Sequence, residues 1–146
     1  AGIARKEKEG DGITPVGTFP LRECWYRADK MDAPKTGLPL HIIHQDDGWC
    51  DDPKSPDYNK HIKLVPRHTS ESWYDEKGYS HEKLWRDDGV YDLIVPIGYN
   101  DSPVVAGLGS AIFLHLEKAE YSPTEGCVAL AKPDLLEIVP YLDTST

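Results

Sequence analysis

The 146-residue sequence contains no apolar run that approaches the length of a membrane span, and no signal peptide. A mature secreted domain whose leader had been removed would look the same, so these absences determine no compartment. An excess of basic residues is missing too: 25 Asp and Glu outnumber 16 Lys and Arg, for a net charge of −9. Because a nucleic-acid partner favours a basic face, we expect no nucleic acid and no membrane insertion.

The sequence also lacks the patterns that hold metals and phosphate cofactors. No Cys-x-x-Cys accompanies the histidines, and His41 and His44 lie three apart in a predicted strand, which places them on opposite faces. The acids between 46 and 52 lack the alternation and terminal Glu of a calcium loop, and "GLGS" (107–110) lacks the context of a phosphate-binding loop. We therefore expect neither a metal nor a cofactor.

Cysteine is scarce and odd in number, with Cys24, Cys50 and Cys127. In an oxidising compartment at least one thiol would stay free or pair with another chain. A Cys24–Cys50 disulfide fits this count, but the spacing does not demonstrate it. Three unpaired thiols is the interpretation that we favour.

The composition predicts one globular domain over residues 1–146. Hydrophobic residues make up 39% of the chain and recur along all of it, while 12 Gly and 12 Pro indicate many turns. Short apolar runs rich in β-formers predict strands at 16–21, 38–45, 91–100 and 109–116, the last buried on both faces. Two further segments are predicted as a long loop (46–60) and as one or two helical turns starting at Ser80 (80–85).

The tail 131–142 is the strongest helix prediction. Pro133 suits the first turn, Asp134 complements the helix dipole, and Pro140 should end or kink the helix. One apolar face is predicted from Leu135, Leu136, Ile138, Val139 and Leu142. The sum is a mainly β domain with short helices.

The first candidate site is Cys127, which follows Gly126 in a turn, twelve residues after His115. Glycine lets a backbone approach closely, and N–H groups near a following helix would lower the pKa of the thiol and line an oxyanion hole. Thiolate chemistry needs a base within reach, and His115 can return to the turn. A small buried cysteine and a satisfied core histidine are the alternatives, and spacing alone favours them.

Two blocks of sequence resemble the L,D-transpeptidase (YkuD-type) catalytic domain. "EGDGITPVGTFPL" (9–21) resembles the Asp-Gly-x-Thr-Pro-x-Gly-x-Phe hallmark near the front of that domain. "IFLHL…SPTEGCVAL" resembles its histidine followed by the Ser/Thr-x-Gly-Cys motif. The middle stretches, "GWCDDP…YN" and "YDLIVPIGYN", look like a compact branch of the same family. The likeness covers nearly the whole chain.

Membership implies a β-sandwich of mixed sheets, with one helix after an active-site cysteine, in an exported monomer of the periplasm or cell envelope. By resemblance, the Cys127 thiolate attacks a carbonyl of a peptidoglycan stem peptide, expels D-alanine and leaves a thioester. His115 would take the thiol proton, and Gly126 and Cys127 would donate backbone N–H groups to the oxyanion. An acceptor amine of the diaminopimelate type would then form an L,D cross-link, or a D-amino acid would be exchanged.

Two positions depart from the family motif. The commoner histidine before Gly-Cys is replaced by Glu125, and the arginine or asparagine two residues after the cysteine is replaced by Ala129. Loss of a basic residue removes an anchor for a substrate carboxylate, which leaves donor recognition open. The chain also starts close to the hallmark, whereas family domains usually have strands before it. Either those strands were lost or this version of the domain is trimmed.

The segment 46–60 is predicted to form a wall of the stem-peptide groove, because loops this long in compact domains mostly function. In this hypothesis Trp49 and Tyr58 pack on the peptide, and Asp51 or Asp52 pairs with its amino group. A solvated connection in which Trp49 plugs the core edge is the alternative. The other predicted substrate-binding residues are Asn59, Tyr99, Asn100, Thr124 and Glu125.

The same residues also suit two other functions. In a hydrolase (an L,D-carboxypeptidase or amidase), water would resolve the thioester in place of an amine. A non-catalytic wall-binding module would keep the fold alone. The sequence does not separate transpeptidase from hydrolase, because the difference lies in which acceptor reaches the acyl-enzyme and how well water is excluded.

Overall fold

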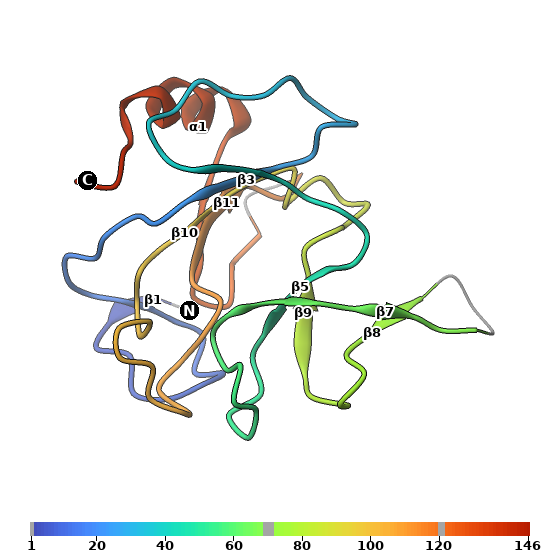
Figure 1. The fold of residues 1–146 in the computed structure, drawn as a ribbon. Helices are drawn as coiled ribbons and strands as arrows, with labels where there is room; N and C mark the ends of the chain where they lie inside the picture. The colour runs from blue at the N-terminus through green and yellow to red at the C-terminus, as the bar shows by residue number, and fades with distance from the viewer. Residues whose placement is uncertain (1, 69–71, 120–121) are drawn as a thin grey trace.

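The computed structural model describes residues 2–68, 72–119 and 122–146. Its centre is a five-stranded sheet of order β12-β11-β10-β3-β4 (Figure 1). The strand β10 is antiparallel to both its neighbours, whereas the outer pairs β3–β4 and β11–β12 are parallel. These strands span Cys24–Tyr26 (β3), Leu40–Ile42 (β4), Leu93–Pro96 (β10), Phe113–Leu116 (β11) and Val128–Leu130 (β12).

A second, antiparallel sheet has the order β6-β5-β9. Its strands span Asp47–Cys50 (β5), His61–Lys63 (β6) and His81–Lys83 (β9). The described residues also form two smaller pairs: β1 (Gly2–Ala4) runs parallel to β2 (Ile13–Pro15), and β7 (Val65–Pro66) pairs with β8 (Trp73–Tyr74). The β7–β8 pair projects from the body of the molecule (Figure 1).

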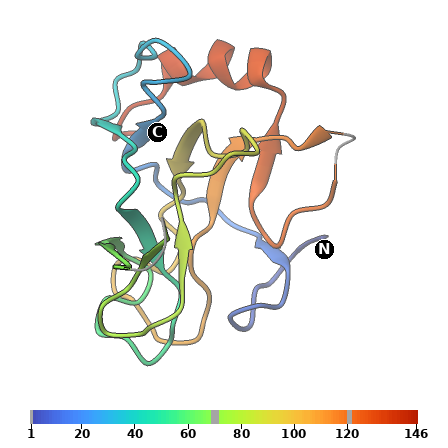
Figure 2. The same ribbon diagram turned by 90° about the vertical axis from the view of Figure 1, so that its right-hand side faces the viewer.

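The two faces of the five-stranded sheet are covered by different elements (Figure 2). Alternate side chains of a strand point to opposite faces, so neighbouring residues of one strand enter different cores. On one face, Leu93, Val95, Leu114 and Leu116 pack with Leu135 and Val139 of the C-terminal helix. On the other face, Trp25, Ile94 and Phe113 pack with Trp49 and Leu84 from the three-stranded sheet side. The predicted class, a mainly β fold with mixed sheets and a C-terminal helix, is confirmed.

Three predicted strands are present but shorter: β4, β10 and β11 lie within 38–45, 91–100 and 109–116. All four residues of β11 are buried, as predicted. The predicted strand at 16–21 is wrong, because the strand in this region is β2 and Val16 is 63% exposed. One strand, β1, precedes the Thr-Pro-x-Gly hallmark.

Two local predictions fail because pairing between distant strands overrides local preference. The predicted helical turns at 80–85 are instead β9, which pairs with β5. The first part of the predicted loop 46–60 is β5 itself, the fully buried central strand of the second sheet. Its sequence, DGWC, contains two residues that strands usually avoid, so the sequence pattern did not indicate it.

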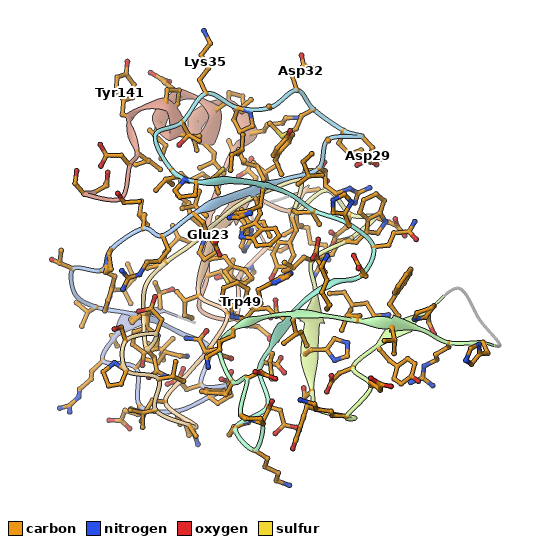
Figure 3. The ribbon with its side chains drawn as sticks, in the orientation of Figure 1. Glu23, Asp29, Asp32, Lys35, Trp49 and Tyr141 are labelled. Atoms are coloured by element: carbon orange, nitrogen blue, oxygen red, sulfur yellow. The ribbon has the colours of Figure 1, made fainter. Side chains whose placement is uncertain are left out.

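The α-helix α1 spans Lys132–Ile138 and continues as a 3₁₀ turn over Val139–Tyr141. Pro133 lies in the first turn, as predicted, and the α-helix ends just before Pro140, which has no N–H to donate. The predicted apolar face is narrower than expected. Leu135 and Val139 are fully buried, whereas Leu136 and Ile138 are 37% and 39% exposed. Tyr141 points outward at this end of the molecule (Figure 3).

All three cysteines lie in the described part of the chain, and none forms a disulfide. Cys24 is buried in the core beside the helix, and burial raises the pKa of its thiol to about 12. Cys50 is buried in β5. Within the described residues, no helix is both long enough and apolar enough to cross a membrane.

Candidate active site

The parallel pairing of β11 with β12 places Cys127 and His115 on the same face of the central sheet. His115 is opposite Ala129, and Leu114 is opposite Val128. Because side chains alternate, Cys127 points to the same face as Ala129 and therefore as His115. Both side chains line one cleft of about 500 Å³. The two candidate catalytic residues, twelve positions apart in sequence, therefore share one cleft, His115 from β11 and Cys127 from the residue just before β12.

The turn before Cys127 is held by the N-terminal hallmark. Gly126 has φ +114°, and a Cβ atom there would lie 2.8 Å from the carbonyl oxygen of Ile13. Thr124 closes the turn, since its hydroxyl donates a hydrogen bond to the Cys127 carbonyl at 2.6 Å. Only glycine suits both the backbone conformation and the close approach. The two sequence blocks that resemble the family are therefore in direct contact.

The Cys127 thiol is held inside the protein by two backbone groups. The Phe113 N–H donates to Sγ at 3.4 Å, and the thiol donates to the Ala111 carbonyl at 3.2 Å. Burial, the largest influence, raises the pKa of the thiol to about 12. The resting group is therefore a neutral thiol, and the expected low pKa is wrong. The helix cannot lower it, because β12 separates Cys127 from the first residue of α1, Lys132.

His115 is 6% exposed and has a defined tautomer. Its Nδ1 lies 2.7 Å from the carbonyl oxygen of Leu116. A carbonyl only accepts, so Nδ1 donates, and Nε2 of the neutral ring is left as an acceptor. Burial lowers the pKa of His115, which keeps the ring neutral near pH 7. The ring of Tyr91 packs edge-on against the imidazole, with 5.5 Å between the ring centroids. A neutral imidazole in the same cleft as a neutral thiol is suited to general-base catalysis.

Charged groups of both signs line the rest of the cleft. The acids include Asp51, Glu82 and Glu125, and the cations are Lys6, Arg86 and Lys118. The Tyr91 hydroxyl donates to Glu82 at 2.6 Å, and burial raises the pKa of Glu82. One oxygen of Asp51, Oδ1, is buried without a hydrogen-bond partner among the described residues.

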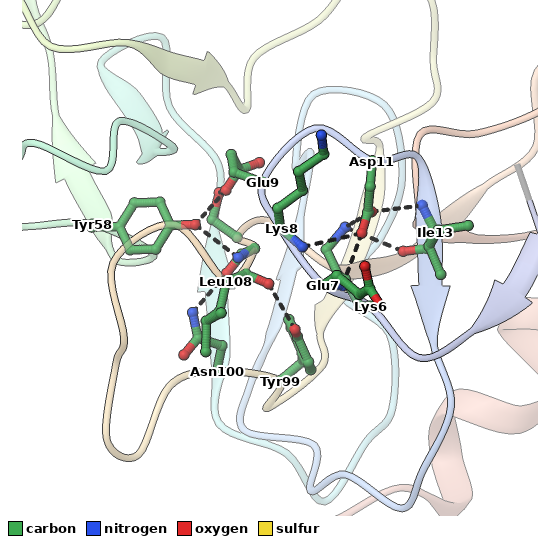
Figure 4. Close-up of polar contacts among 12 residues, drawn as sticks. Lys6, Glu7, Lys8, Glu9, Asp11, Ile13, Tyr58, Tyr99, Asn100 and Leu108 are labelled. Atoms are coloured by element: carbon green, nitrogen blue, oxygen red, sulfur yellow. Dashed lines mark hydrogen bonds and ion pairs between the residues drawn. The ribbon is translucent and has the colours of Figure 1, made fainter.

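Lys6 closes the N-terminal side of this cleft. Its side chain is 2% exposed, and its ammonium group lies 2.6 Å from Asp11 and 3.3 Å from the Ile13 carbonyl (Figure 4). The lysine holds the pKa of Asp11 well below its usual range. Asp11 also accepts hydrogen bonds from the backbone of Glu7, Lys8 and Ile13. The aspartate of the hallmark therefore organises the loop that borders the active site.

Comparison with known families assigns the chain. The model of the L,D-transpeptidase catalytic domain, YkuD, matches residues 1–146, the whole chain. The chain belongs to the YkuD family. This confirms the resemblance found in the hallmark and in the Gly-Cys motif. A search of curated proteins and a search of solved structures each gave no match.

In this YkuD domain, five of the predicted site residues line the cleft: Asp51, His115, Thr124, Glu125 and Cys127. Gly126 is buried beneath the N-terminal segment and is not among the residues that line the cleft. Its contribution to the oxyanion site stays a prediction. Its observed role is to give the turn the backbone conformation that Cys127 needs.

The aromatic wall predicted for the groove lies instead in the interior. Trp49 is 9% exposed, contacts Phe113 edge-on at 5.2 Å, and is central in Figure 3. This placement corresponds to the alternative in which Trp49 fills the core. Asn59 is buried beside it and accepts hydrogen bonds from the Trp49 indole and the Ala111 N–H. Its amide donates to the carbonyls of Tyr99 and Asn100. Both side chains are therefore structural.

The other predicted groove residues also support loops rather than line the cleft. Tyr58 is 2% exposed; its hydroxyl donates to Glu9 and accepts from the Gly109 N–H (Figure 4). Asp52 accepts from the backbone of Lys54 and Ser80. Tyr99 and Asn100 bind the carbonyls of Leu108 and Val105, which holds the loop between β10 and β11. None of the four is among the residues that line the cleft, and these hydrogen bonds engage their polar groups.

Sequence reasoning missed several residues that line the cleft: Lys6, Glu9, Glu82, Arg86, Tyr91 and Lys118. Arg86 lies on the connection between β9 and β10, and Tyr91 lies at its end. That connection contains no recognisable motif. Only the pairing of β9 with β5 and of β10 with β11 brings it to the dyad.

Over the described ranges, no cluster of His, Cys, Asp and Glu side chains is arranged to hold a metal ion. His61 lies 2.7 Å from Asp47, and His41 lies 3.1 Å from Glu23. These histidines are engaged with single carboxylates rather than grouped as ligands.

Proposed function

We propose that this YkuD domain is a cysteine L,D-transpeptidase that acts on peptidoglycan stem peptides. The observation that supports it best is the shared cleft of Cys127 and His115, because the Nδ1–H of the histidine binds the Leu116 carbonyl and leaves Nε2 as the proton acceptor. Membership of the YkuD family supports the same class of reaction. We place the protein, as an exported monomer, in the periplasm or cell envelope, because peptidoglycan lies there.

In the first half-reaction, Cys127 attacks the carbonyl carbon of the donor peptide. His115 Nε2 takes the thiol proton as the S–C bond forms, because the thiol alone is neutral at pH 7. The backbone N–H of Cys127, with that of Gly126 as predicted, donates to the oxyanion. Collapse of the intermediate breaks the C–N bond, and His115 returns the proton to the departing amine. A thioester on Cys127 remains.

In the second half-reaction, an acceptor amine attacks the thioester carbonyl. His115 takes a proton from the amine, the C–S bond breaks, and the proton returns to the sulfur. The acids Asp51, Glu82 and Glu125 give part of the cleft a negative potential, which favours the approach of an acceptor that carries an ammonium group. Water in the place of this amine would give the hydrolase reaction.

Mass spectrometry of purified muropeptides tests this function. We expect incubation with the protein to give an acyl adduct on Cys127, and products with a new amide bond when an acceptor amine is added. The matched control is Cys127→Ala under the same conditions. Release of the terminal amino acid without any amine transfer would identify a hydrolase instead. Failure of every donor to acylate Cys127 would overturn the proposal.

A further inference from the structure

Arg86 projects a fixed guanidinium group into the active-site cleft. It lines the same cleft as Cys127 and His115, and its side chain is 41% exposed, so a ligand can reach it. Asp88 holds one edge, with Nε 3.0 Å from Oδ1 and Nη2 bound to Oδ2. The guanidinium carbon lies 5.0 Å from the centroid of the Tyr91 ring. An arginine supported on two sides loses little freedom when it binds a ligand.

The second edge of this guanidinium has no hydrogen-bond partner within residues 2–68, 72–119 and 122–146. Arginine has five N–H donors, and Asp88 accepts from Nε and from one N–H of Nη2. Among the described residues, no acceptor binds Nη1. The Nη1–Nη2 edge is therefore available, and its two parallel donors match the two oxygens of a carboxylate.

The position of Arg86 relative to the dyad indicates which carboxylate it would meet. The guanidinium stands over Tyr91, and the Tyr91 ring contacts His115. Its charge also lowers the pKa of His115, as expected for a cation near the ring. His115 is the group that protonates the departing amine. In an α-amino acid the carboxylate is separated from that amine by a single carbon, so it would lie close to the same cation.

We propose that Arg86 binds the free carboxylate of the amino acid that leaves the donor peptide. This inference rests on the proposed function. Arg86 would supply a cation for a cleft in which Ala129 stands where the family motif has an arginine or asparagine. The acids Asp51, Glu82 and Glu125 of the same cleft repel a carboxylate, so a cation is needed to hold one there.

The other two cations of the cleft are less suited to this role. Lys6 is nearly inaccessible and already bound to Asp11. Lys118 is exposed, and no hydrogen bond or ion pair within the described residues holds its ammonium group in one place. Arg86 is the cation that is accessible, fixed and directed by a neighbouring carboxylate.

A binding experiment tests the subsite without turnover. The Cys127→Ala protein is titrated with a synthetic stem tetrapeptide ending in D-alanine as the free acid, and with the same peptide ending in an amide. We expect the acid to bind about 10-fold more tightly or better, as a bidentate charged pair allows. Adding Arg86→Gln should reduce this ratio to about 2-fold or less, and Arg86→Lys should restore part of it.

Arg22 is the matched control, because Asp101 holds it through the same two nitrogens and it lies outside the cleft. Arg22→Gln in the Cys127→Ala background should keep the full preference for the acid. Unchanged preference in Arg86→Gln, or no preference in its parent, would overturn the subsite. Folding of each variant is checked by its melting temperature; if Arg86→Gln does not fold, the comparison of Arg86→Lys with Arg22→Lys decides.

The outcome also separates this inference from the proposed function. If Cys127 forms no thioester but the acid is still preferred through Arg86, the proposed reaction falls and the carboxylate site stands. If the thioester forms at equal rates from acid and amide donors in both parent and Arg86→Gln proteins, the reaction stands and the subsite falls.

Discussion

The two faces of β11 show how one short strand serves both the fold and the site. Leu114 and Leu116 point to the helix side, where they pack in an apolar core that Leu135 and Val139 close. Phe113 and His115 point to the other side, where the packing is incomplete and a cleft remains beside Cys127. The difference shows that the alternation of a strand separates residues that stabilise the sheet from residues that react.

The largest effect should come from Cys127, which lies on the face of the sheet that borders the cleft, here called the open face. Cys127→Ala should abolish formation of the thioester, because no other described cysteine lines the cleft. Its melting temperature should change little, because only the sulfur atom is removed and the residue lines the cleft rather than the closed core beside the helix. Intact-protein mass spectrometry after incubation with muropeptides measures the adduct. Cys24→Ser and Cys50→Ser, which change buried thiols, are the controls, and the folded fraction of each should still form the adduct. Full turnover by Cys127→Ala would show that the nucleophile is misassigned.

His115→Gln should lower the rate of acylation by about 100-fold or more while costing little stability. Glutamine keeps much of the volume and polarity of histidine, but it cannot accept a proton at neutral pH. The initial rate and the melting temperature should be measured on the same preparation. Parallel losses of rate and stability would assign His115 to the core and remove the contrast between the two faces.

Leu114→Ala tests the opposite, closed face of β11, which packs against the C-terminal helix. Leu114 is 9% exposed and belongs to the core beside the helix. Its truncation should lower the free energy of unfolding by about 2–5 kcal/mol, because a cavity remains under α1. Chemical denaturation measures this loss. The folded protein should still acylate Cys127 at close to the parent rate, and a specific loss of acylation in fully folded Leu114→Ala would contradict the separation.

The pH dependence should differ between a small reagent and the substrate. The pKa of the Cys127 thiol is raised to about 12, so alkylation by iodoacetamide should rise about tenfold per pH unit from pH 7 to 10, without a plateau. Because burial lowers the pKa of His115, its basic form persists below pH 6.5, and turnover should fall only at more acidic pH. A plateau of alkylation near neutral pH would indicate a preformed thiolate instead.

The smallest effect is expected at the rim of the open face. Glu125 is exposed and lines the cleft before Gly126. Glu125→His introduces the commoner family residue and should be tolerated, with the preference for acceptor amines changed more than the rate of acylation. Competition between two acceptors, one with and one without a second positive charge, measures this preference. A protein that no longer acylates would show that Glu125 is itself catalytic.

Buried contacts explain why the sequence predicted the dyad better than its surroundings. Cys127, Gly126 and Asp11 belong to two short motifs. Each motif is a run of consecutive residues, so it can be recognised in the sequence without knowledge of the fold. Trp49, Tyr58 and Asn59 looked like groove residues because aromatic and amide side chains in a polar segment resemble a binding loop. They are buried because β5 pairs with two distant strands, and no local pattern indicates such pairing.

The sequence by itself determined the family, the mainly β class, the C-terminal helix and the identity of the candidate nucleophile and base. It could do so because these features depend on short motifs, on residue preferences and on the periodicity of apolar positions. The tertiary structure alone decided that the Cys127 thiol is neutral, that Asn59 is buried and joins several segments by hydrogen bonds, and that Arg86 lines the cleft of the dyad. Burial and proximity arise from the pairing of strands far apart in the chain, so the pKa of Cys127 and the charges of the cleft exist only in the folded protein.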